Sequence, residues 1–159
     1  MRADEPNRER LVLGIDPGAS GAAAMICVRS GRDTATLQRV VGAEALLVIG
    51  ALVQQANLVV IEGQQASPNM GRGSAYQLGV GVGRIEGVLT LRATCPVVSA
   101  RPAAWRWSFG LGGGKEGKAN SMAMADAVLG GYSGLKSHDE ADAVLLAWWG
   151  WKNVLEARQ

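Results

Sequence analysis

Short apolar runs separated by turn residues recur along the chain and predict five strands. Runs of this kind closed by Gly, Pro, Asn or Asp are typical of strands, whereas apolar residues three and four positions apart are typical of helices. The runs that we predict to be strands cover residues 11–16, 21–28, 34–41, 58–61 and 96–99. The stretches that we predict to be helices cover residues 43–56, 74–91, 118–129 and 138–155, with a further brief helix beginning at Pro102.

The order of these elements predicts a single α/β domain. Three strands follow one another closely up to residue 41, as in an antiparallel meander, and the continuous apolar run at 58–61 suits a buried central strand parallel to the first. Helices and strands then alternate, and two helices close the chain. We therefore expect a mixed five-stranded sheet flanked by helices over residues 11–159, preceded by a disordered tail over residues 1–10.

Composition supports a compact domain and removes several functional classes. Of the 159 residues, 48% are hydrophobic and 19% are charged, which excludes disorder for most of the chain. No apolar run reaches the roughly 18 residues that a membrane span needs, and the polar N-terminus is unlike a signal peptide. We therefore expect a cytoplasmic protein without membrane contact. Cys27 and Cys95 lack the spacing of a zinc site and are expected to be free thiols.

Two carboxylates stand where predicted strands end. Asp16 closes the first strand before a Pro-Gly turn, and Glu62 closes the strand at 58–61. If these two strands are neighbours, both side chains emerge at one edge of the sheet. Each residue also has a plainer interpretation, because an Asp commonly starts a turn and a Glu at a strand end can form a structural ion pair.

A second acidic pair lies at the start of the last predicted helix. Asp139 and Asp142 are three positions apart and share one helix face, although Asp139 alone also suits a helix start. Carboxylates that converge without matching cations need divalent metal ions, and oxygen-only ligand sets favour Mg²⁺ or Mn²⁺ over zinc. Two such ions support in-line phosphodiester displacement, so the acidic residues predict a nuclease. His138 is a candidate proton relay, or an ordinary surface histidine at a helix start.

Basic residues suggest a surface for DNA, although the net charge of +2 is too small to imply nucleic acid by itself. Four of them lie between residues 101 and 118, where residues 110–114 are expected to form a flexible glycine-rich loop whose backbone can approach phosphates. A solvated loop is the alternative. The candidate DNA-binding residues are Arg72, Arg101, Arg106, Lys115 and Lys118.

Four motifs in this order resemble those of the RuvC family of Holliday-junction resolvases, members of the ribonuclease-H-like superfamily. They are Gly-Ile-Asp-Pro-Gly at 14–18, Val-Ile-Glu at 60–62, Arg-Pro-x-x-Trp-Arg at 101–106 and His-Asp-x-Ala-Asp-Ala at 138–143. The resemblance spans about residues 11–151, is closer in style to phage-type and organellar members, and implies a ribonuclease-H-like fold.

The resemblance also implies an activity. The family acts as a homodimer on four-way junction DNA in recombination and repair, nicks two opposed strands symmetrically and leaves 5′-phosphate ends. Lys118 matches a basic residue near the scissile phosphate. The residues that match the family's ligands for two Mg²⁺ ions, for which Mn²⁺ is expected to substitute, are Asp16, Glu62, Asp139 and Asp142.

One departure from the bacterial members follows Glu62, where Gly-Gln-Gln at 63–65 replaces an aromatic wedge. Without this wedge, the resemblance does not indicate how the chain opens the junction centre or whether it prefers a particular sequence for cleavage. Two other functions stay open: a non-catalytic module that binds branched DNA, and a ribonuclease-H-like nuclease that acts on other branched DNA or on RNA.

Glycines recur on one face of the helix predicted at 74–91. Gly79, Gly83 and Gly87 are four positions apart, and each lowers helix stability by roughly 0.5–1 kcal/mol relative to Ala. Such a stripe lets another backbone approach closely. The partner is either the protein's own sheet or the same helix of a second subunit, and the resemblance favours the second subunit.

Overall fold

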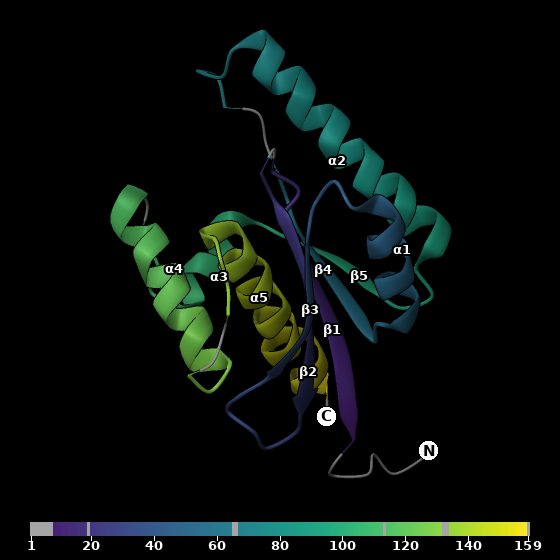
Figure 1. Ribbon diagram of the computed structural model, residues 1–159, viewed down its shortest axis with the longest axis vertical. Coiled ribbons are helices and arrows are strands. Elements are labelled where there is room, and N and C mark those ends of the chain that lie inside the picture. The colour runs from purple at the N-terminus through teal and green to yellow at the C-terminus, as the bar shows by residue number, and fades with distance from the viewer. Residues whose placement is uncertain (1–7, 19, 65–66, 113, 132–133, 159) are drawn as a thin grey trace.

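Five strands form one mixed sheet in the computed structural model, which describes residues 8–18, 20–64, 67–112, 114–131 and 134–158 (Figure 1). The spatial order is β3-β2-β1-β4-β5. The strands are β1 (Glu9–Ile15), β2 (Ala22–Arg29), β3 (Thr36–Gly42), β4 (Leu58–Glu62) and β5 (Val97–Ala100). The first three are antiparallel, whereas β4 and β5 run parallel to β1, which confirms the predicted sheet.

Helices cover both faces of this sheet (Figure 1). They are α1 (Leu46–Gln55), α2 (Arg72–Arg92), α3 (Pro102–Ser108), α4 (Gly114–Val128) and α5 (His138–Gly150), followed by a π-helical turn (Trp151–Leu155) and a 3₁₀ turn (Glu156–Arg158). One core lies between the sheet and α1 and α2, and a second lies between the sheet and α3, α4 and α5. The apolar run of β4 is buried because helices cover it on both sides.

The last long helix lies directly on the central strand. A Cβ at Gly14 of β1 would overlap the Ala143 carbonyl of α5 and come within 2.6 Å of the Ala147 nitrogen. Glycine at this position therefore allows α5 to contact the backbone of β1. This close contact fixes the start of α5 relative to the end of β1.

The first strand begins earlier than the sequence predicts. Glu9 and Arg10, which we expected in the disordered tail, belong to β1, because Glu9 lies opposite Arg29 of β2 and forms an ion pair with it. The rest of that expected tail, residues 1–7, lies outside the described residues.

The glycine-rich loop is shorter than expected. Helix α4 begins at Gly114, so Lys115 belongs to the helix and not to the segment before it. Gly117 is needed in this helix because a Cβ there would overlap the carbonyl of Gly112. Both Lys115 and Lys118 are therefore held by helical backbone.

Helix α2 is the most exposed long element, because Ile85 and Leu89 are its only buried residues among those the structure describes. Its first turns extend beyond the sheet (Figure 1). A Cβ at Gly79, Gly83 or Gly87 would meet nothing within 4 Å, so the stripe does not pack on the protein's own sheet. Across the described residues, no helix is both long and apolar enough to cross a membrane.

Candidate active site

Asp16 lies in a tight turn at the end of β1. Its amide donates to the carbonyl of Ala22, and its Oδ1 accepts a hydrogen bond from the amide of Gly18 at 3.0 Å. A Cβ at Gly21 would come within 2.7 Å of the Gly18 nitrogen, so glycine is required for the chain to fold back this closely. Asp16 is 8% exposed, and backbone holds its carboxylate on the side of the turn.

Glu62 ends the neighbouring parallel strand and lies close to Asp16. The register pairs Ile15 with Ile61, so the two carboxylates follow paired residues at one edge of the sheet, as predicted. Gln64 Nε2 donates to Glu62 Oε2 at 2.5 Å and lies 3.4 Å from Asp16 Oδ1. The indole Nε1 of Trp105 donates to Glu62 Oε1 at 3.0 Å. One amide side chain therefore connects the two carboxylates.

The start of α5 supplies the other acidic residues. Ser137 caps this helix by accepting from the amide of Glu140, whose own carboxylate accepts from the amide of Lys136. Asp139 lies 3.0 Å from His138 Nε2, and Asp142 is buried at the α5 face toward α3. Glu140 is thus occupied by hydrogen bonds at the helix start.

Arg106 of α3 pairs with Asp142. Its Nη1 donates to Asp142 Oδ2 at 3.1 Å, and its guanidinium carbon lies 4.9 Å from the centre of the Trp105 ring. We predicted Arg106 to be a DNA contact, and the structure shows it paired with one of the acidic residues. The other oxygen, Asp142 Oδ1, is buried without a hydrogen-bond partner, and so is the hydroxyl of Ser121 on α4.

Burial and mutual repulsion shift the proton affinities of these carboxylates. Burial raises the pKa of Asp16 to about 6, with Asp139 and Asp142 adding to the rise and the amide of Gly18 opposing it. Burial also raises the pKa of Glu62 to about 7, with a further contribution from Asp16. Burial raises the pKa of Asp142, against the effects of the Ser121 hydroxyl and Arg106. Charge repulsion therefore links Asp16 and Asp142 with each other, with Glu62 and with Asp139.

The chemistry of this cluster fits a divalent cation. Its donors are carboxylate oxygens, which Mg²⁺ and Mn²⁺ prefer, and the unpartnered Asp142 Oδ1 has capacity for a further contact. Within the part of the chain that the structure describes, no three acidic, His or Cys side chains are already arranged to hold a metal ion. Instead, Gln64, Trp105 and Arg106 donate to carboxylate oxygens, and binding of a cation would exchange some of these bonds.

The remaining basic residues lie outside these contacts. Lys115 and Lys118 are exposed in the first turns of α4, which begins at the same end of the molecule as α5 (Figure 1). Arg101 is exposed just before α3, and Arg72 is exposed at the first residue of α2.

The sequence did not predict that three further residues belong to the site. The bond from Trp105 to Glu62 was missed because nothing in the sequence distinguishes a tryptophan that is buried in the core from one that also donates a hydrogen bond, and Trp105, at 0% exposure, does both. Gln64 and Ser121 carry no motif of their own. The available signal was position: Gln64 comes two residues after Glu62, and Ser121 comes one helical turn after Lys118.

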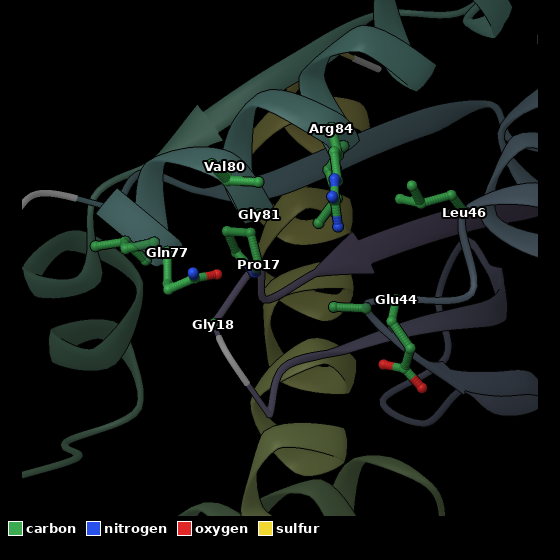
Figure 2. A pocket seen from close by; sticks show the side chains of 11 residues that line it. Pro17, Gly18, Glu44, Leu46, Gln77, Val80, Gly81 and Arg84 are labelled. Atoms are coloured by element: carbon green, nitrogen blue, oxygen red, sulfur yellow. The ribbon is translucent and has the colours of Figure 1, made fainter. Parts of the chain in front are cut away.

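A hollow of about 230 Å³ lies on the α2 side of the Asp16 turn (Figure 2). Pro17 of the turn, Glu44, and Gly81 and Arg84 of α2 are among the residues that line it. A Cβ at Gly81 would lie 3.6 Å from the carbonyl oxygen of Pro17, so the inner face of α2 rests on this turn. Arg84 points into the hollow and lies apart from the glycine stripe, whose residues face open space.

Solved structures with a similar fold include RuvC from Thermus thermophilus. That structure has a TM-score of 0.64 and 22% sequence identity, with 87% of this chain and 92% of that chain covered. The structure of T. thermophilus RuvC in complex with Holliday junction substrate also has a TM-score of 0.64, with 20% identity and coverage of 92% and 97%. No protein-family model and no curated protein sequence matches the chain. The molecule therefore has a RuvC-like, ribonuclease-H-like fold.

Proposed function

We propose that the chain is a metal-dependent endonuclease that resolves four-way DNA junctions. The observation that carries this proposal is the placement of Asp16, Glu62 and Asp142 at one sheet edge of a fold similar to that of a RuvC bound to a Holliday junction. Two neighbouring parallel strands and one helix supply these carboxylates, and their raised pKa values reflect a concentration of negative charge in a buried position.

The proposed mechanism assigns a role to each polar residue of the cluster. Bound Mg²⁺ would neutralise the charge that develops on the attacking and leaving oxygens of the phosphodiester. The residues that would hold two such ions are Asp16, Glu62, Asp139 and Asp142. Trp105 and Gln64 orient Glu62 through their hydrogen bonds, and the Gly18 amide orients Asp16. His138, which contacts Asp139, is proposed to relay a proton.

Binding of the DNA backbone falls to exposed basic residues near the acidic cluster. Lys115 and Lys118 are exposed at the start of α4, which begins at the same end of the molecule as α5, and Lys118 is proposed to contact the phosphate that is cut. Arg101 and Arg72 would contact phosphates farther along the arms. Contacts of this kind position the DNA and make binding depend on salt.

Paired cleavage requires two active sites, and we propose that a homodimer supplies them. The glycine stripe of α2 is open and unpacked, which suits close approach of the same helix from a second copy. A two-fold axis through this contact would relate the two sites in the same way that opposed strands are related in a symmetric junction.

Cleavage of a mobile four-way junction with and without Mg²⁺ tests the proposed function. We expect nicks at symmetric positions in two opposed strands, with 5′-phosphate ends, in the presence of Mg²⁺ or Mn²⁺ and none in EDTA. Binding without cleavage under both metal conditions would instead support the non-catalytic module. Equal cleavage of linear duplexes or of RNA–DNA hybrids would support a nuclease with a different substrate.

A further inference from the structure

Arg106 is a cation placed where the proposed metal-dependent activity needs a metal ion. Its Nη1 lies 3.1 Å from Asp142 Oδ2, and the side chains of both residues are largely shielded from solvent. A carboxylate in such a position is stabilised by a positive charge. We propose that Arg106 stabilises Asp142 in the metal-free protein and releases it when a divalent cation binds. This inference rests on the proposed function.

Asp142 cannot move away from Arg106 to meet a cation, because its helix is fixed. The next residue, Ala143, contacts Gly14 of the central strand so closely that no Cβ fits between them. The rest of α5 is buried almost throughout its length. Asp142 Oδ1 is buried and unpartnered and Oδ2 is bonded to Arg106, so a cation that binds either oxygen brings a second positive charge next to the guanidinium. The exchange therefore has to come from movement of the arginine.

Arg106 has a second partner that keeps the guanidinium in place when the ion pair opens. The guanidinium carbon lies 4.9 Å from the centre of the Trp105 ring, within the range of a cation–π contact. Trp105 itself is fully buried and tied to Glu62 through its indole nitrogen. The ring is thus a fixed support on which the guanidinium can turn from Asp142 toward solvent, where 24% of the Arg106 side chain is already exposed.

This arrangement gives Arg106 two successive partners. Without metal it pairs with Asp142, and with metal its donors become available to a phosphate of bound DNA, which a planar guanidinium binds well. Arrival of the metal would therefore increase the positive charge presented to DNA twice: by the ions themselves and by the released arginine. The exchange would couple metal binding to DNA binding at this site.

Titration of the DNA-free protein with Mn²⁺, followed by the electron paramagnetic resonance signal of free Mn²⁺, tests the competition. We expect Arg106→Gln to bind Mn²⁺ about three- to tenfold more tightly than the wild type, as expected for loss of one partly shielded competing ion pair. Arg101→Gln is the matched control, since it removes an exposed charge from the same segment and should change the affinity less than twofold. In an Asp142→Asn background the effect of Arg106→Gln should disappear.

A second measurement reports on Arg106 itself and needs no substitution. Arginine labelling with phenylglyoxal, read by peptide mass spectrometry, should show Arg106 protected in EDTA and several times more reactive at saturating Mn²⁺. Arg101 should react equally in both conditions. Labelling of Arg106 that does not change on Mn²⁺ binding would overturn the inference.

The two measurements separate failure of this inference from failure of the proposed function. If wild type and Arg106→Gln bind Mn²⁺ equally, or the variant binds it more weakly, the arginine does not compete with the metal, and the nuclease proposal is untouched. If neither protein binds Mn²⁺ at millimolar concentration and Asp142→Asn changes nothing, both proposals are wrong.

Discussion

At the scale of single residues, the candidate site is defined by which acidic side chains are held in the cluster and which are not. Asp16, Glu62 and Asp142 are shielded from water and lie in one another's electrostatic field. Glu140, on the same helix as Asp142, accepts a hydrogen bond from a backbone amide at the helix start instead. Asp142 and Glu140 therefore have separate roles, and a substitution at Glu140 can serve as a control for substitutions in the cluster.

Neutralising the cluster should remove cleavage and leave DNA binding intact. We expect Asp16→Asn, Glu62→Gln and Asp142→Asn each to lower the rate of junction cleavage by more than about a hundredfold, beyond the effect usual for residues that only orient metal ligands. Junction affinity, measured in Ca²⁺ by gel shift, should stay within about twofold. Asp139→Asn should be milder.

Glu140→Gln is the control for this series and should cut at a rate close to that of the wild type. Normal cleavage by Asp142→Asn would contradict the assignment of the metal site, because it would show that the buried charge at this position is not used.

The raised pKa values predict how the metal-free protein responds to pH. Because the folded state keeps protons on Asp16 and Glu62 up to pKa values of about 6 and about 7, it binds more protons than the unfolded chain above pH 4. This stabilising contribution is fully present below about pH 4 and is lost as pH rises to about 7. For Asp16 the corresponding difference in unfolding free energy is at most about 3 kcal/mol.

Chemical denaturation in EDTA at pH 5 and pH 7.5 measures this contribution. Asp16→Asn should show a smaller loss of unfolding free energy between the two pH values than the wild type, whereas Glu86→Gln, which changes an exposed residue of α2, should match the wild type. Mg²⁺ should restore stability at pH 7.5 in the wild type and in Glu86→Gln, and not in Asp16→Asn. An Asp16→Asn variant with the wild-type pH dependence would contradict the proposed electrostatic cost.

At the scale of elements, periodic sequence patterns predict the helices and strands and where they end, but they do not predict contacts between segments that are distant in the chain. The ends of β1 and β4 were predictable because apolar runs stop at Asp16 and Glu62, and the shared face of Asp139 and Asp142 follows from helical spacing. The start of α4 was missed because its glycines resemble a loop, although Glu116 in its first turn favours a helix start. The pairing of α3 with α5 has no periodic signal, since it joins single residues from distant segments.

Helix α3 combines three different environments in consecutive residues. Trp105 is buried, Arg106 is shielded beside Asp142, and Trp107 is 86% exposed. An exposed tryptophan one residue from the candidate site is suited to stacking on an unpaired base. Trp107 could thus take the role of the aromatic wedge that is missing after Glu62. Trp107→Ala should therefore weaken junction binding about tenfold without changing the melting temperature.

Leu91→Ala is the matched control, because Leu91 is also largely exposed, at 84%, but lies on α2. Fluorescence of 2-aminopurine at the junction centre should rise on binding of the wild type and stay low with Trp107→Ala. Equal affinity of both variants and the wild type would show that Trp107 does not contact DNA.

At the scale of the whole molecule, the remaining question is what covers the open face of α2. A Cβ at Gly83 meets no atom of the described residues within 4 Å, so a larger side chain fits the isolated subunit and should stabilise its helix by about 0.5–1 kcal/mol. In a dimer that packs α2 on α2, the same side chain would separate the two backbones. Gly83→Leu therefore distinguishes the two situations without the complication of a subunit that fails to fold.

We expect sedimentation to show a dimer for the wild type at micromolar concentration and a monomer for Gly83→Leu, with an unchanged or higher melting temperature. The monomer should nick junctions in one strand at a time, because its acidic cluster is intact while the two-fold partner is missing. Gly73→Leu, at another open position of α2 off this stripe, should stay dimeric and cut both strands. A Gly83→Leu protein that remains dimeric would place the interface elsewhere on the molecule, and the glycines would then need a different explanation.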